Sequence, residues 1–172
     1  MHSPLPTAVT DAGRALIFLR GADCLGFLQG MVTQDVTRLA AEKIQFAALL
    51  SPQGKILHDM LLVAIDATTV MLDVGAAQEA ALLQRLQRYR LRADVMFSTH
   101  VPAECGAIPV LTLADPRHPA LPSRIYDAMA ATVRLGQGES THALGIPEVG
   151  RDFAPDTLTA LDAGYDLLHA IS

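Results

Sequence analysis

Residues 43–65, KIQFAALLSPQGKILHDMLLVAI, are the most informative stretch of this sequence for its fold. Two apolar runs flank a short segment, Ser51-Pro52-Gln53-Gly54. Proline presets φ for an early turn position and glycine supplies a positive φ at a later one, so this segment predicts a tight turn. Because the flanking runs are rich in Ile, Leu, Phe and Val, we expect a β-hairpin whose strands are largely buried.

Three polar side chains interrupt the second run of this hairpin: Lys55, His58 and Asp59. A carboxylate in an apolar strand is costly unless a partner satisfies it, so Asp59 is the candidate site residue. The alternative is an aspartate that faces solvent or pairs with Lys55 or an arginine. Neighbouring strand residues point to opposite faces, so His58 and Asp59 cannot both line one cavity. We interpret His58 as a surface residue.

The composition narrows the class of protein. The 172 residues are 51% hydrophobic, which allows one domain, or one and a fragment, with a substantial core. The formal net charge of −5 disfavours nucleic acid as a partner. Cys24 and Cys105 are far apart and have no CxxC or His-rich spacing, so we expect neither zinc nor a disulfide framework.

The expected cellular location follows from the same features. Two isolated cysteines fit a reducing compartment. No apolar run reaches about 18 residues, so we expect no membrane-spanning helix. The first residues lack the basic start and apolar stretch of a signal peptide, and they are poor in arginine. We therefore expect a cytoplasmic protein.

Strand and helix patterns are interleaved along the chain. We expect strands at 14–20, 69–74, 94–98 and 107–113, and helices after Asp23 and over 76–91. In the second helix, Leu82, Leu83, Leu86 and Tyr89 repeat at helical spacing and are expected to face a core. Because a hairpin joins two strands directly, the pattern predicts an α+β fold with mixed or antiparallel sheets and helices packed on one face.

We divide the chain into three parts. Residues 1–113 form an N-terminal α+β subdomain, and residues 114–124, with three prolines, form a connection. Residues 125–172 form an incomplete second subdomain of helix and loop, with a helix expected over 125–144. The chain ends on an apolar phrase, LLHAIS, which we interpret as an interruption because termini are usually polar.

Several phrases resemble one family in the same order along the chain. They are GADCLGFLQGMVTQDV (21–36), FAALLSPQGKILHDMLLV (46–63), YRLRADV (89–95), GIPEVGRDFAPDTL (145–158) and LDAGYDLLHAIS (161–172). These phrases are similar to the YgfZ family of folate-binding proteins, which support iron–sulfur cluster assembly or repair and tRNA modification. That family is related to the aminomethyltransferase, or T-protein, of the glycine cleavage system. The resemblance covers nearly the whole chain, from about residue 14 to residue 172.

The resemblance implies a T-protein-like α+β fold around a folate cavity, with tetrahydrofolate or a derivative as the ligand. It implies iron–sulfur client proteins as partners. Asp59 matches the T-protein aspartate that lies by the reactive nitrogens of the folate, so it becomes the expected catalytic and folate-binding residue. Leu49 and Leu61 are expected to form the walls of the pterin site.

Two departures from the family are visible. In the family, the phrase that matches Ala170-Ile171-Ser172 leads into a K-G-C-[YF]-x-G-Q-E motif. This chain ends before that motif, so we expect the N-terminal part of the fold alone, truncated at its C-terminal side and without the family cysteine. The family also tends to place an arginine four residues before the glycine of the G-I-P phrase, where this chain has Thr141.

A basic cluster stands out in this acidic chain: Arg85, Arg88, Arg90 and Arg92. We interpret it as the solvated face of a helix. The alternative is a binding surface for the glutamate tail of folate or for RNA phosphates.

Three functions remain open at this stage. The first is a folate-binding accessory protein that supports iron–sulfur cluster assembly or repair, with no enzymatic activity expected of this chain. The second is a folate-dependent aminomethyltransferase, which Asp59 favours. The third is a truncated, non-catalytic module for interaction or dimerisation, because missing strands would expose sheet edges that promote self-association.

Overall fold

The central hairpin forms as the sequence predicts. β3 (Ile44–Leu50) and β4 (Ile56–Asp66) pair in antiparallel register. The turn between them is closed by the Gly54 amide, which donates to the Ser51 carbonyl at 2.9 Å. Gly54 has a φ of 79°, the left-handed conformation that glycine adopts most readily.

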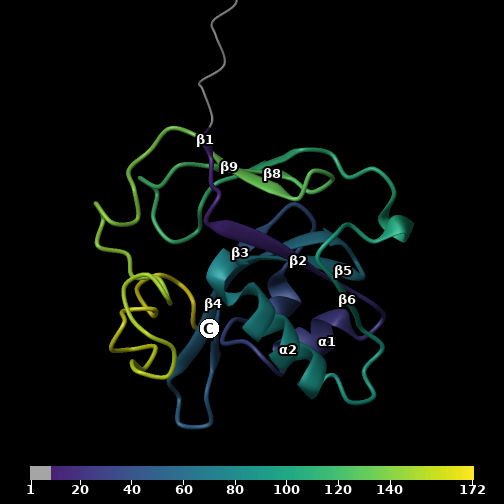
Figure 1. The fold of residues 1–172 in the computed structure, drawn as a ribbon, viewed down its shortest axis with the longest axis horizontal. Coiled ribbons are helices and arrows are strands. Elements are labelled where there is room, and N and C mark those ends of the chain that lie inside the picture. Colours follow the sequence, from purple (N-terminus) through teal and green to yellow (C-terminus); the bar gives the residue numbers. More distant parts are fainter. Residues whose placement is uncertain (1–8) are drawn as a thin grey trace, which may run out of the picture.

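A larger sheet is built outward from this hairpin in the computed structural model, which describes residues 9–172 (Figure 1). Its strand order is β3-β4-β5-β2-β6, and every neighbouring pair is antiparallel. The added strands are β2 (Arg14–Arg20), β5 (Thr69–Gly75) and β6 (Met96–Ser98). The strands expected at 14–20 and 69–74 are confirmed, and the strand expected at 94–98 is shorter than predicted.

A smaller antiparallel sheet has the order β1-β9-β8-β7. Its strands are β1 (Val9–Thr10), β7 (Leu111–Leu113), β8 (Arg124–Asp127) and β9 (Thr132–Leu135). β1 and β7 come from the part of the chain that we assigned to the first subdomain, and the boundary at residue 113 stays a prediction.

The helix predicted over residues 125–144 is wrong, because β8 and β9 form a hairpin there. Tyr126 and Val133 are cross-strand partners, and both are buried against the larger sheet. This long-range burial outweighs the local preference of the segment. The final residues, 159–172, form a series of turns.

Both α-helices pack on one face of the larger sheet, as predicted (Figure 1). They are α1 (Cys24–Gln29) and α2 (Glu79–Tyr89), and residues 9–172 also contain single-turn 3-10 helices at Val36–Arg38, Ala76–Gln78 and Ala103–Cys105. Leu82 and Leu86 of α2 are fully buried in this layer and Leu83 is partly buried, as their spacing predicts, but the prediction for Tyr89 is wrong, because it lies at the end of α2 and is 50% exposed. No helix between residues 9 and 172 combines the length and apolarity needed to cross a bilayer.

The opposite face of the larger sheet is covered by two different parts of the chain (Figure 1). The smaller sheet covers β2 and β5, where Phe18 and Met71 pack with Tyr126. The C-terminal segment, residues 149–170, covers β3 and β4, where Phe46 and Leu61 pack with Tyr165. The molecule is therefore an α+β fold with one sheet at its centre and three covering units.

Candidate functional site

A cavity of about 450 Å³ lies on the face of the larger sheet that points away from the helices. Its lining comes from residues 11–14, the end of β5 and the following turn, the 115–124 connection and the 139–151 loop. Charged side chains line one part of the cavity, and Leu121, Pro122 and Leu135 give another part an apolar surface. Segments far apart in the sequence therefore meet at one site.

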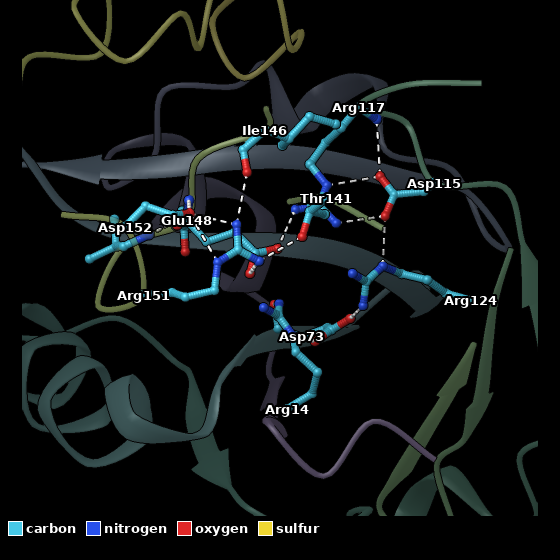
Figure 2. Close-up of polar contacts among 12 residues, drawn as sticks. Arg14, Asp73, Asp115, Arg117, Arg124, Thr141, Ile146, Glu148, Arg151 and Asp152 are labelled. Atoms are coloured by element: carbon cyan, nitrogen blue, oxygen red, sulfur yellow. Dashed lines mark hydrogen bonds and ion pairs between the residues drawn. The ribbon is translucent and has the colours of Figure 1, made fainter. Parts of the chain in front are cut away.

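Eight charged side chains form a continuous chain of ion pairs beside this cavity (Figure 2). In order, the members of this ion-pair chain are Arg14, Asp73, Arg124, Asp115, Arg117, Glu148, Arg151 and Asp152. Consecutive members approach within 2.5–2.9 Å, and positive and negative groups alternate. The charges balance, so the chain brings no net charge to the cavity.

Asp73, on β5, is the most deeply buried carboxylate of this ion-pair chain. It accepts hydrogen bonds from Arg14 Nε at 2.6 Å, Arg124 at 2.7 Å and the Tyr126 hydroxyl at 2.8 Å. Burial alone would raise the pKa of Asp73, but the two guanidinium groups outweigh burial and lower it. Asp73 is therefore an ionised, fully partnered group that joins β2, β5 and β8.

Asp115 forms ion pairs with two arginines of the ion-pair chain, Arg117 and Arg124. Arg117 donates to both of its carboxylate oxygens, and Arg124 Nε donates to one of them at 2.8 Å. Burial would raise the pKa of Asp115, but these hydrogen bonds and charges lower it to about 2. The Arg117 guanidinium also lies over the Phe46 ring, 5.4 Å from its centroid. This contact attaches the 114–124 segment to the central hairpin.

Asp59 is buried, with 3% of its surface exposed, and neutral groups satisfy it. Its oxygens accept hydrogen bonds from the Gln78 amide at 3.2 Å, the Val149 backbone N–H at 2.9 Å and the Tyr165 hydroxyl at 2.6 Å. No arginine or lysine within residues 9–172 forms an ion pair with it. Gln78 and Val149 line the cavity and Asp59 does not, so Asp59 lies behind the cavity wall.

The prediction that His58 lies at the surface is wrong, because only 5% of it is exposed. Its side chain is on the helix face of β4, where α2 covers it, and it shares a small cavity with Arg85 and Arg88. Its Nδ1 is 3.2 Å from Gln78 Oε1, so one amide joins His58 to Asp59. Burial lowers the pKa of His58, which favours the neutral imidazole.

The remaining predicted site residues lie apart from one another. Leu49 packs among the side chains between the larger sheet and its helices, whereas Leu61 packs on the opposite face with Phe46 and Tyr165. Neither residue lines the cavity, and their contact with a folate stays a prediction. Thr141 does line the cavity, and its hydroxyl accepts a hydrogen bond from Arg151 at 2.6 Å.

Sequence reasoning missed the ion-pair chain, although one of its members carried a readable signal. Asp73 interrupts an apolar strand, TVMLDV, in the same way that Asp59 interrupts β4. Burying either carboxylate carries a similar free-energy cost. Asp73 was therefore as good a candidate site residue as Asp59. No local signal marks Arg117 or Arg124, which lie in a proline-rich connection and at its end.

The described part of the chain, residues 9–172, contains no cluster of three or more His, Cys, Asp or Glu residues suited to a metal ion. Cys24 is buried in the core between the larger sheet and its helices, and burial raises the pKa of its thiol to about 11. Cys105 is partly buried, with its Sγ 3.5 Å from an Arg20 nitrogen. Both thiols are free.

Comparison with curated proteins finds relatives along nearly the whole chain. The mitochondrial iron–sulfur cluster assembly factor IBA57 homolog of Coccidioides immitis is 28% identical over 98% of this chain and 51% of its own length. Human mitochondrial IBA57 is 24% identical over 93% of this chain and 56% of its own length. The chain therefore spans about half the length of these relatives.

Aminomethyltransferases are similar over shorter regions. The aminomethyltransferase of Chlorobaculum tepidum is 35% identical over 35% of this chain and 16% of its own length. The crystal structure of the glycine cleavage system aminomethyltransferase T from Bartonella henselae superposes with a TM-score of 0.50 at 20% identity. It covers 52% of this chain and 25% of that chain, which confirms the predicted T-protein-like fold.

The family model that describes the GCVT N-terminal domain matches residues 11–130. The matched region contains the whole larger sheet, both α-helices and Asp59. It makes up more than half of the sequence, and so this chain belongs to the GCVT N-terminal domain family.

Proposed function

We propose that this chain is a folate-binding accessory module of the YgfZ type that supports iron–sulfur cluster assembly. The observation that carries the proposal is its similarity to the two IBA57 assembly factors, which extends over 98% and 93% of the chain. In this proposal tetrahydrofolate or a derivative is the ligand, and iron–sulfur client proteins are the partners. Support of tRNA modification and a cytoplasmic location remain predictions of the same hypothesis.

The cavity fits a folate in size and in chemistry. Its volume of about 450 Å³ is within the usual range for small-molecule sites, about 300–1,000 Å³. Leu121, Pro122 and Leu135 offer apolar surface for a ring system. Arg151, at 40% exposed, is the most accessible arginine of the cavity lining, and a carboxylate of a glutamate tail would pair with it by displacing Glu148 or Asp152.

Arg151 bears directly on the departure from the family at Thr141. Its guanidinium donates to the Thr141 hydroxyl at 2.6 Å and to the Ile146 carbonyl at 2.9 Å. An arginine from the GRDF phrase therefore lies beside the position where the family tends to carry one. We propose that Arg151 supplies the positive charge that Thr141 lacks.

The position of Asp59 favours the accessory function over the transferase. In the structure described here, Gln78, Val149 and Tyr165 already occupy its oxygens, and it does not line the cavity. A folate could touch Asp59 only if the segment that carries Val149 and Tyr165 moved away. We therefore propose that Asp59 primarily holds this segment closed, and contact with folate would need an opened form.

Calorimetric titration of the purified chain with tetrahydrofolate tests the ligand. We expect saturable binding that Arg151→Gln weakens about tenfold or more, since a charge-assisted contact is lost. Arg38→Gln is the matched control, because Arg38 is an exposed arginine in an ion pair remote in sequence from the cavity lining. Absence of binding by a folded protein, or equal binding by both variants, would overturn the folate assignment.

A second experiment separates the accessory function from the transferase. The chain is added to the reconstitution of an iron–sulfur enzyme from its apo form, and recovered activity is measured with and without tetrahydrofolate. The accessory function predicts faster recovery that does not depend on a folate-borne one-carbon unit. One-carbon transfer that Asp59→Asn abolishes would instead support the aminomethyltransferase function. The similarity to the Chlorobaculum tepidum aminomethyltransferase is the observation behind this alternative.

A further inference from the structure

The surface at the C-terminal end of α2 is distinct from the folate cavity and combines three unusual features. Apolar side chains are exposed on it, four arginines gather on it without acidic partners, and a groove runs along it. We define this α2–β6 surface by these residues: Arg85, Arg88, Tyr89, Arg90, Leu91, Arg92, Met96 and Phe97. It lies on the helix side of the larger sheet (Figure 1), whereas Asp73 of the ion-pair chain lies on the opposite face with Tyr126 of the smaller sheet.

The first feature is exposed apolar surface. Leu91 is 84% exposed, Met96 is 55% exposed and Tyr89, which its spacing placed toward the core, is 50% exposed. Leu91 also has a φ of 46°, in the left-handed region where a glycine usually follows a helix. A large apolar side chain that is both exposed and strained at a helix end has no stabilising role within the chain.

The second feature is positive charge without a partner. Within residues 9–172, none of the arginines at 85, 88, 90 and 92 forms an ion pair with a carboxylate. A solvated helix face explains an exposed arginine, but it does not explain Arg85. Arg85 is partly buried, and its Nε, which is shielded from solvent, has no hydrogen-bond partner among residues 9–172.

The third feature is shape. An open groove of about 620 Å³ is lined by Gln87, Arg88, Arg90, Leu91, Met96 and Phe97. A smaller cavity of about 130 Å³ adjoins it through Arg88 and has Arg85 and His58 in its wall. Within the described residues, 9–172, β6 is an edge strand whose one partner is β2, so its outer backbone groups border this surface.

We propose that the α2–β6 surface binds an acidic segment of a partner protein, with an apolar side chain in the groove and carboxylates against Arg85 and Arg88. Exposed Tyr, Met and Arg side chains are the residues that protein interfaces favour. Nucleic acid fits less well, because the chain carries a net charge of −5 even with these four arginines included. The remaining surface would repel an extended polyanion but not a short acidic segment.

Fluorescence anisotropy with a labelled peptide of alternating glutamate and leucine tests the proposal. We expect binding that Arg88→Gln weakens about fivefold or more, as a lost contact between opposite charges predicts. Arg38→Gln, which removes an exposed arginine elsewhere, is expected to leave binding unchanged. Leu91→Gly should raise the melting temperature, because it relieves the left-handed strain, and should nevertheless weaken binding.

Four outcomes would overturn the proposal. They are no binding of the glutamate peptide, equal binding of a peptide with lysine in place of glutamate, tighter binding of an oligouridylate, and self-association in sedimentation that Arg88→Gln abolishes. The last two would assign the surface to nucleic acid and to a second copy of this chain, respectively. None of these measurements depends on whether the cavity on the other face binds folate.

Discussion

Two buried carboxylates on neighbouring strands of the larger sheet are stabilised in different ways. Asp59 on β4 and Asp73 on β5 lie on the same sheet face, because Asp73 is the partner of Leu61, two residues beyond Asp59. Asp73 has two guanidinium partners and one hydroxyl. Asp59 has an amide, a backbone N–H and a hydroxyl, and no cation.

The difference follows from what covers each strand. The smaller sheet brings Arg124 and Tyr126 over β5, whereas the C-terminal segment brings Val149 and Tyr165 over β4. A carboxylate held by cations is costly to release, because the cations would remain buried and unpaired. A carboxylate held by neutral donors is easier to uncover, so we expect the region around Asp59 to open at a lower free-energy cost than the region around Asp73.

The largest effect is expected where one cation of the ion-pair chain is removed. Arg124→Met leaves Asp73 and Asp115 each without one partner, and we expect it to lower the free energy of unfolding by about 3–5 kcal/mol. Urea denaturation measures the change. Arg38→Met, at an ion pair whose arginine is 80% exposed, should cost less than about 1 kcal/mol. Similar losses in both variants would show that burial does not distinguish the two ion pairs.

Acid should weaken the ion-pair chain. The folded pKa of Asp115 is about 2, below its ordinary value, so its stabilisation is complete above the unfolded pKa of about 4 and is lost as the pH falls toward 2. The loss should be on the order of 2 kcal/mol, measured as urea midpoints across this range. In Asp115→Asn, the pH dependence should be flatter. An unchanged slope in that variant would contradict the assignment to Asp115.

A smaller effect is expected at the neutral donors of Asp59. Tyr165→Phe removes the hydroxyl that lies 2.6 Å from Asp59 Oδ2, and we expect it to cost about 1–3 kcal/mol. Hydrogen exchange of the Val149 amide should accelerate as the C-terminal segment loosens. Tyr89→Phe is the matched control, since Tyr89 is half exposed, and it should change neither quantity. If Val149 keeps its protection in Tyr165→Phe, this hydroxyl does not hold the segment.

The smallest effect is expected at the exposed end of the ion-pair chain. Arg151 is 40% exposed, so Arg151→Gln should lower the free energy of unfolding by less than about 1 kcal/mol. The same variant is expected to weaken tetrahydrofolate binding strongly. A stability loss as large as that of Arg124→Met would mean that Arg151 is primarily structural.

Local sequence patterns predict the central hairpin and the buried face of α2, but they fail at the β8–β9 hairpin, where a helix was expected. Pro52 and Gly54 specify a turn through φ preferences that act within a few residues, and the flanking apolar runs pair as predicted. The spacing of Leu82 and Leu86 specifies the buried stripe of α2 in the same local way. The phrase order along the chain was sufficient to predict the T-protein-like fold, which the family match and the superposition confirm.

Contacts between distant segments determine which hydrogen-bond and ion-pair partners the buried polar groups have. Arg124 and Asp73 are 51 residues apart in sequence, and Tyr165 and Asp59 are 106 apart, so no local pattern could pair them. His58 is buried because α2 returns over β4, and β8 forms a strand because the larger sheet offers it an apolar face. The type of a residue indicates the free-energy cost of burying its polar group. Which group offsets that cost depends on the fold of the whole chain.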